Sequence, residues 1–174
     1  MEEFKLEPEQ TTHSSRLIKY MLPVIIWVAI LFYFSNQPFQ VQDVQPLLAR
    51  VIGEDQLRAL LPPIEFQYGS SLISSQEPYR FVQFFIRKGT HVVVYGVLGL
   101  LVLRLAIHLA GTRLKAILYT LYLVGAVAYL DEYNQGLNPN RTGSFNDVVL
   151  DMAGALLGIA IYLHWQKSSK YKGE

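Results

Sequence analysis

Polar residues that could bind a ligand or transfer a proton fall in two short segments of this chain. In the first segment, R-K-G-T-H-V-V-V-Y, His91 is four residues from Arg87, three from Lys88 and four from Tyr95, so these side chains follow one side of a helix. The second segment, residues 129–151, separates two apolar runs. It contains the other candidates, which are Asp131, Glu132, Gln135, Arg141, Asp147 and Asp151.

These residue types suit two kinds of chemistry. A histidine beside carboxylates can act as a general acid or base, and an arginine can bind both oxygens of a phosphate or carboxylate. The catalytic candidates are His91, Asp131, Glu132 and Arg141, and the whole set is a candidate for binding a ligand. The chain has no cysteine, and the two segments offer no pair of histidines. We therefore expect neither a metal site nor a cofactor.

The hydropathy pattern puts both segments at the ends of membrane-spanning helices. Hydrophobic residues make up 51% of the chain, and four apolar stretches approach the roughly 20 residues that cross a bilayer core. We predict an all-α, polytopic membrane protein with helices at about 17–34, 90–110, 115–131 and 148–165. No small-residue cleavage site follows the first stretch, which indicates a retained helix and not a signal peptide.

The long segment between the first two helices, about residues 35–86, has apolar residues at helical spacing in places. We expect short amphipathic helices that rest on the outer leaflet, with a partly ordered loop as the alternative. The run P-Y-R-F-V-Q-F-F-I-R-K-G suits an element in the headgroup region or one that leads into the second helix. A net charge of +1 argues against nucleic acid, so the expected partners are membrane lipids.

The positions of lysine and arginine predict the orientation in the cell membrane. Basic residues flank the start of the first helix, the turn between the second and third, and the end of the fourth. The consistent topology has cytoplasmic tails at 1–16 and 167–174 and a membrane domain at 17–166. The loop at 35–86 then lies outside. A contrary signal comes from five basic residues on that outer side, namely Arg50, Arg58, Arg80, Arg87 and Lys88.

Under this topology, the outer ends of three helices carry all the candidate residues. A charge at the bilayer centre costs about 2.5–3.5 kcal/mol and less near the interface, so the carboxylates need partners. The cations expected to neutralise them are Arg87, Lys88, Arg141 and protonated His91. For Arg87, Glu132 and Asp147, simple anchoring in the headgroup layer is an equal alternative. His91, Tyr95 and Asp151 lie deeper, where ionisable residues usually face a cavity or a partner.

Four motifs occur in order along the chain: F-S-N-Q at 34–37, R-K-G-T-H-V-V-V-Y-G-V-L-G at 87–99, D-E-Y-N-Q-G-L-N-P-N-R at 131–141 and N-D-V-V-L-D-M-A-G-A-L-L-G at 146–158. Together they resemble the VanZ-like family of bacterial membrane proteins. The resemblance covers most of the membrane-spanning chain but not residues 40–80. Asp151 departs from the family, which usually has asparagine there. The resemblance implies low-level resistance to the glycopeptide teicoplanin or a housekeeping role in the cell envelope.

Two functions remain open at this point, beside a purely structural membrane protein whose polar residues fix the helix ends. The first is a binding protein whose outer polar cluster holds an envelope lipid or a ligand related to the cell wall or to glycopeptides. The alternative is an enzyme acting on an envelope lipid or cell-wall precursor, with His91 as general acid or base and Asp131 or Glu132 orienting it. In that enzyme Arg141 would stabilise negative charge. Transport is disfavoured, because the ionisable residues gather at one end of the helices and do not continue across the membrane.

Overall fold

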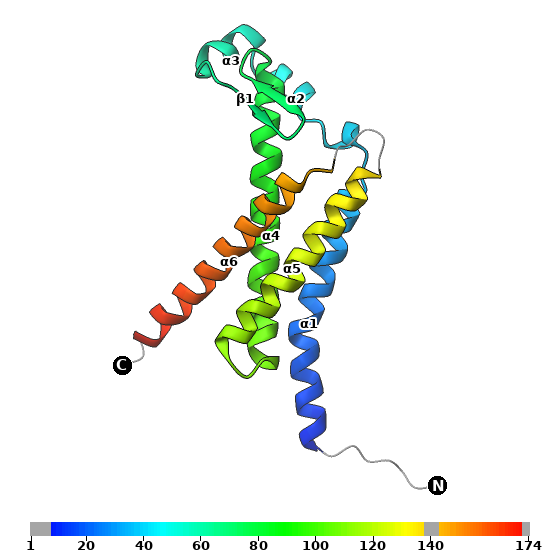
Figure 1. The fold of residues 1–174 in the computed structure, drawn as a ribbon, viewed down its shortest axis with the longest axis vertical. Helices are drawn as coiled ribbons and strands as arrows, with labels where there is room; N and C mark the ends of the chain where they lie inside the picture. Colours follow the sequence, from blue (N-terminus) through cyan, green and yellow to red (C-terminus); the bar gives the residue numbers. More distant parts are fainter. Residues whose placement is uncertain (1–7, 138–142, 172–174) are drawn as a thin grey trace.

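The fold is a bundle of four long helices, seen in a computed structural model that describes residues 8–137 and 143–171 (Figure 1). Each helix is long and apolar enough to cross a membrane. The chain is therefore an all-α, polytopic membrane protein, as predicted. The four helices are α1 (Pro8–Ser35), α4 (Pro78–Leu109), α5 (Arg113–Gly136) and α6 (Phe145–Tyr171).

Helix α4 begins at Pro78 and not near residue 90 as expected. Proline suits the first turn of a helix, where its missing N–H costs nothing. The run P-Y-R-F-V-Q-F-F-I-R-K-G is thus the first part of α4. With 32 residues, α4 is about 48 Å long and exceeds the bilayer core of about 30 Å. Its N-terminal turns project beyond the other helices (Figure 1).

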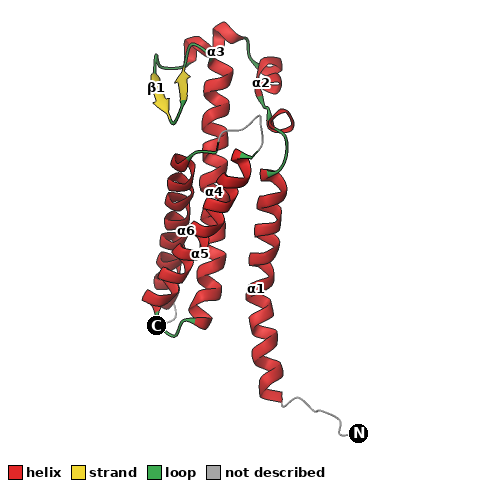
Figure 2. Cartoon of the chain, turned by 45° about the vertical axis from the view of Figure 1, so that its right-hand side comes forward, coloured by secondary structure: helices red, strands yellow, loops and turns green. Residues whose placement is uncertain are grey.

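The segment between α1 and α4 folds into three short helices and a hairpin at one end of the bundle, which we call the loop end (residues 36–77; Figure 2). The short helices agree with the prediction, whereas the hairpin was not predicted. Its two strands are joined by a two-residue turn in which Gly69 has a φ of 60°, a conformation that favours glycine. The elements are η1 (Phe39–Gln42), α2 (Gln45–Val51), α3 (Glu54–Leu60), β1 (Glu65–Tyr68) and β2 (Ser71–Ser74).

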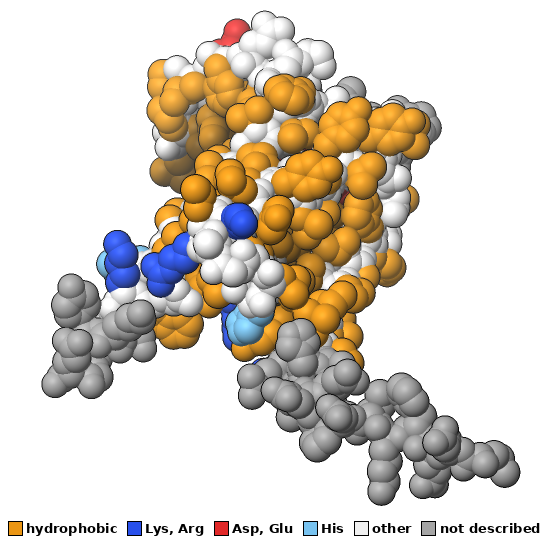
Figure 3. Space-filling model, turned by 60° about the horizontal axis from the view of Figure 1, so that its bottom comes forward, with side chains coloured by type: hydrophobic (Ala, Val, Ile, Leu, Met, Phe, Trp, Pro, Cys, Tyr) orange, Lys and Arg blue, Asp and Glu red, His pale blue; other side chains and the backbone are white. Residues whose placement is uncertain are grey.

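Helix α4 is the central element, because α1, α5 and α6 all pack against it. The buried core between these helices includes Leu98 and Val102 of α4, Val124 and Ala128 of α5, and Ala155 of α6. Helix α1 lies apart along much of its length, and only 11% of its apolar window is buried. Large apolar side chains are exposed on all four long helices, and they cover much of the face seen in Figure 3, as expected of a surface in contact with lipid.

The closest contact in the bundle joins α4 to α6 through small residues. A β-carbon at Gly154 would lie 2.5 Å from the carbonyl oxygen of Val92, and one at Gly158 would overlap the backbone of Gly96. A β-carbon at Gly99 would lie 2.8 Å from the carbonyl oxygen of Ala155. The two helices run in the same direction, so their backbones touch over about two turns. This contact fixes the register of one helix against the other.

We expect Gly154→Ala to destabilise the bundle by about 1–3 kcal/mol, because the added methyl group forces the α4 and α6 backbones apart. The matched control is Gly89→Ala on α4, where an added β-carbon meets nothing within 4 Å. Unfolding by titration with a denaturing detergent measures both variants. Equal stability of Gly154→Ala and the wild type would show that the helices are not in backbone contact.

Candidate functional site

Lys88 and Asp147 form an ion pair between α4 and α6 at the loop end of the bundle. The two side chains are only 14% and 3% exposed. Tyr68, on the hairpin strand β1, donates a hydrogen bond of 2.7 Å to the same Asp147 carboxylate, and its ring lies 4.5 Å from the Lys88 ammonium. The hairpin therefore covers this ion pair and limits its contact with water.

Burial raises the pKa of Tyr68 above its ordinary value, and the hydrogen bond to Asp147 raises it further. Both effects act in the same direction because each disfavours the phenolate. The Tyr68 hydroxyl thus stays protonated at neutral and mildly alkaline pH. It remains a hydrogen-bond donor to Asp147 over that whole range.

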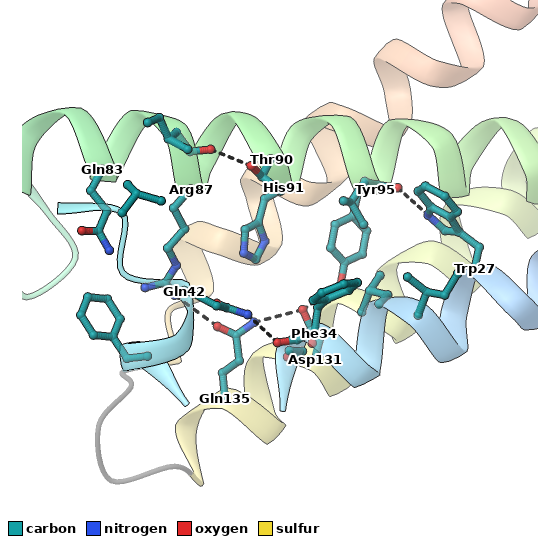
Figure 4. A pocket seen from close by; sticks show the side chains of 17 residues that line it. Trp27, Phe34, Gln42, Gln83, Arg87, Thr90, His91, Tyr95, Asp131 and Gln135 are labelled. Carbon is teal, nitrogen blue, oxygen red and sulfur yellow. Dashed lines mark hydrogen bonds between the residues drawn. The ribbon is translucent and has the colours of Figure 1, made fainter. Parts of the chain in front are cut away.

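A chain of hydrogen bonds links α4 to α5, from Arg87, next to Lys88 in sequence, to Tyr95 about two turns deeper in the bundle. Arg87 donates to the side-chain oxygen of Gln135 at 3.2 Å, and Gln135 donates to Asp131 Oδ2 at 3.1 Å. The Tyr95 hydroxyl donates to the same oxygen at 3.2 Å. Asp131 and Gln135 are one helical turn apart, which brings both to the α4 side of α5. The network orients the Arg87 and Asp131 side chains toward one space between the helices (Figure 4).

Glu132 is held by the segment that leads into α6. The backbone N–H of Ser144 donates to Glu132 Oε2 at 2.9 Å. This contact requires glycine at the preceding position, because a β-carbon at Gly143 would overlap the carbonyl oxygen of Glu132. Glu132 is 5% exposed and therefore points into the bundle, so it is not a headgroup anchor. Asp147, which is 2% exposed, is likewise buried.

His91 meets Asp151 across the α4–α6 contact, with 3.1 Å between Nδ1 and Oδ1. The carboxylate that orients His91 is thus Asp151, not Asp131 or Glu132 as the enzyme hypothesis supposed. Asp151 is fully buried at 0% exposure. Asparagine there could offer only a neutral oxygen or an amide to the histidine, whereas a carboxylate can accept a proton or stabilise an imidazolium.

His91, Asp131, Glu132 and Asp151 form a compact group, which we call the buried quartet. One potential ligand atom from each of these residues lies within 4.8 Å of every other. Imidazole and carboxylate groups are common metal ligands. Sequence reasoning did not anticipate this arrangement because it looked for a pair of histidines. The three carboxylates instead come from two adjacent residues of α5 and one residue of α6.

A cavity of about 490 Å³ lies between α1, α4 and α5 and opens beside the buried quartet (Figure 4). We call it the lipid-side cavity. Its walls are mostly apolar and include Trp27, Leu31 and Phe34 of α1. Its polar part is formed by Arg87, His91, Tyr95, Asp131 and Gln135. The cavity is therefore amphipathic: one part can hold hydrocarbon and the other a charged or hydrogen-bonding group.

A second cavity of about 790 Å³ lies under the hairpin at the loop end. Arg80, Lys88, Ser144 and Asp147 line it, so it is more polar than the first. Gln83 and Arg87 border both cavities. Arg87 thus lies between a space that faces the loop end and a space that faces the lipid side of the bundle.

The structure brings together nine of the ten predicted site residues, and the tenth, Arg141, lies outside the described residues. Sequence reasoning missed Tyr68, Gln83, Ser144 and Trp27. The Tyr-Gly-Ser-Ser turn signal could have identified the hairpin that carries Tyr68. Trp27 carried no polar signal, yet its indole N–H donates to the carbonyl oxygen of Val94 at 3.0 Å and fixes α1 against α4.

Comparison with known proteins yields one finding. The family model described as VanZ/LLP1 matches residues 20–166, which include most of the first and fourth membrane-spanning segments, all of the second and third, and every residue of the buried quartet. No curated protein and no solved structure gives a significant match to the chain.

We expect Lys88→Met to destabilise the protein by about 3–5 kcal/mol, because it leaves the Asp147 charge buried without its cation. Adding Asp147→Asn to that variant should restore part of the loss. Unfolding in denaturing detergent provides the measurement.

The matched control is Arg80→Gln, which breaks the pair between Arg80 in the first turn of α4 and Glu77, the residue just before that helix. That pair is 54% and 61% exposed, so its loss should cost less than about 1 kcal/mol. Equal costs for the two single variants would contradict a buried, stabilising Lys88–Asp147 pair.

Proposed function

The chain belongs to the VanZ/LLP1 family of membrane proteins, and from this premise we propose that it binds an anionic or zwitterionic envelope lipid in the lipid-side cavity. The headgroup lies at the polar part of the cavity, and the hydrocarbon chains follow the apolar wall formed by α1. The observation that carries this proposal is the amphipathic lining of a single cavity of about 490 Å³.

Arg87 is the residue best suited to recognise the headgroup. Its guanidinium has five N–H donors, and the hydrogen bond to Gln135 uses one of its nitrogens. The remaining donors can bind two oxygens of one phosphate or carboxylate. Thr90 and Tyr95 add hydroxyl groups to the same cavity. Asp131 suits the cationic part of a zwitterionic headgroup.

Helix α1 supports access from the bilayer. Its apolar window is the least buried of the four, so a lipid would displace few protein contacts as it enters between α1 and α4. The hydrogen bond from Trp27 to Val94 closes the cavity toward the middle of the membrane. A lipid could then enter laterally while its headgroup stays near the loop end.

A membrane-embedded enzyme is the second candidate, and the His91–Asp151 contact favours it. A carboxylate on Nδ1 holds the ring so that Nε2 can take or give a proton, as in other histidine–carboxylate pairs. His91 also lines the lipid-side cavity, within reach of a bound headgroup. In this candidate, Arg87 would stabilise negative charge that develops on the substrate.

The loop end faces the outside of the cell in this proposal, and both termini lie in the cytoplasm. Arg113 and Lys115 lie at the short α4–α5 turn and Lys167 near the end of α6, and basic side chains are visible from this end of the molecule (Figure 3). The positive-inside rule gives most weight to such short turns and helix ends, and it assigns this end to the cytoplasm. With four spans, α1 begins and α6 ends on that same side (Figure 1).

The chain contains no cysteine, so single cysteines report the orientation directly. We expect Leu60→Cys in α3 to react with a membrane-impermeant maleimide on intact cells. Thr112→Cys in the α4–α5 turn should react only after the cells are permeabilised. The reverse pattern would place the buried quartet near the cytoplasm and remove the argument for an envelope ligand.

Lipid retention tests the binding function. We expect Arg87→Gln, purified in mild detergent, to retain at least about tenfold less anionic lipid than the wild type, because it loses charge-assisted hydrogen bonds. Mass spectrometry of the extracted lipids gives the ratio. The matched control is Arg104→Gln on the same helix, which removes an exposed guanidinium beside Tyr20.

Equal retention by the wild type and Arg87→Gln would contradict the binding proposal. The enzyme hypothesis would be favoured if the wild type converts added lipid to a species with a new headgroup and His91→Gln does not. If the cavity also underlies teicoplanin resistance, expression in a sensitive bacterium should raise the inhibitory concentration for the wild type and Arg104→Gln but not for Arg87→Gln.

A further inference from the structure

The buried quartet contains more negative charge than the described residues neutralise. Three of its members are carboxylates that are 5% exposed or less. In the described part of the chain, Lys88 pairs with Asp147, and Arg87 donates to the neutral side-chain oxygen of Gln135 and not to a carboxylate of the quartet. Among the described residues, no ion pair involves Asp131 or Glu132. Like charges buried close together are unfavourable unless a cation or protons compensate them.

Each carboxylate in the quartet has one oxygen that is bonded and one that is not. Asp131 uses Oδ2, Glu132 uses Oε2 and Asp151 uses Oδ1 for the hydrogen bonds described above. Their other oxygens, Asp131 Oδ1, Glu132 Oε1 and Asp151 Oδ2, are buried and meet no hydrogen-bond donor among the described residues. A buried acceptor without a partner costs about 1–3 kcal/mol, and more when charged.

This pattern matches the way proteins prepare metal ligands. A ligating carboxylate is commonly held through one oxygen by a hydrogen bond, which leaves its other oxygen for the ion. His91 Nδ1 and Asp151 Oδ1 lie 3.1 Å apart, so one ion could take both atoms as ligands in place of the contact between them. Two ligands on opposite sides of an ion, with bonds of about 2.1 Å, are about 4.2 Å apart. The separations within 4.8 Å in the quartet therefore suit one shared ion after small side-chain movements.

We propose that His91, Asp131, Glu132 and Asp151 bind one divalent metal ion where α4, α5 and α6 meet. The donor set has one imidazole and three carboxylates and no thiolate, which suits Mn²⁺ or Zn²⁺ better than Cu⁺. Asp151 contributes the additional negative charge that asparagine would lack. The ion would hold the three helices together at a point where their carboxylates otherwise repel one another.

If the lipid-side cavity binds a lipid as proposed, the metal site also contributes to binding its headgroup. His91 and Asp131 belong both to the quartet and to the polar lining of the lipid-side cavity. An ion bound there would present a positive charge to a phosphate or carboxylate headgroup, next to Arg87. Arg87 itself is not a metal ligand, so its variant separates the two proposals.

The test uses the full-length protein in detergent, freed of metal with a chelator and titrated with Mn²⁺. Electron paramagnetic resonance of the free Mn²⁺ gives the number of ions bound. We expect one ion per chain in the wild type and in Arg87→Gln. Glu132→Gln and Asp151→Asn should each weaken binding by at least about tenfold, since each replaces a charged ligand by an amide of similar shape. Elution as a single folded species, checked by size exclusion, confirms that these variants are intact.

The matched control is Glu77→Gln, which removes an exposed carboxylate at the loop end. It should bind Mn²⁺ like the wild type. A second measurement is thermal unfolding: Mn²⁺ should raise the transition temperature of the wild type and not that of Glu132→Gln. Absence of binding by Mn²⁺ and Zn²⁺ would overturn the metal site and leave protons to neutralise the quartet. Equal weakening in Glu77→Gln and Glu132→Gln would also overturn it, because the binding would then be a surface effect.

Discussion

The backbone contact between α4 and α6 is the constraint on which the rest of the structure depends. Glycines at positions 96, 99, 154 and 158 let the two helices approach until their backbones touch. Such a contact tolerates little sliding or rotation, because any shift brings a side chain against a carbonyl group. One turn toward the loop end, the same register places Lys88 against Asp147 and His91 against Asp151. The glycine contact between α4 and α6 thus positions the Lys88–Asp147 and His91–Asp151 pairs.

The polar residues in turn limit which arrangements of α5 are possible. Asp131 and Glu132 can be buried only where donors reach at least one oxygen of each, and these donors come from α4 and from the backbone of Ser144. Inside a membrane, no water is present to form a hydrogen bond with a polar group that lacks a protein partner. The hydrogen bonds therefore restrict the rotation of α5 about its own axis.

Helix α1 has a different role from the other three. It makes few contacts with the bundle and encloses the lipid-side cavity without filling it. A tightly packed α1 would remove the cavity, and a detached α1 would remove its apolar wall. Loose packing held by the Trp27–Val94 hydrogen bond keeps a space of lipid-like character next to the polar residues. Binding and stability thus depend on different parts of one fold.

The membrane character and the helical faces could be predicted from the sequence alone. Four apolar stretches of sufficient length dictate four helices, because only a helix satisfies its own backbone inside a bilayer. Spacing of three and four residues places Arg87, His91 and Tyr95 on one side of α4, and Asp147 and Asp151 on one side of α6. These are local properties of a single helix, so no knowledge of its neighbours is needed.

Only the tertiary structure decided which of these faces meet. The partner of His91 is Asp151, although Asp131 and Glu132 seemed equal candidates along the chain, because the α4–α6 register is set by glycine contacts between helices. Tyr68 reaches Asp147 across 79 positions of sequence through a hairpin at the loop end. The carboxylate oxygens of the buried quartet that lack a hydrogen bond, and the lipid-side cavity, both result from the way separate helices pack together. Periodicity along one helix carries no information on its rotation against another, and that rotation determines the site.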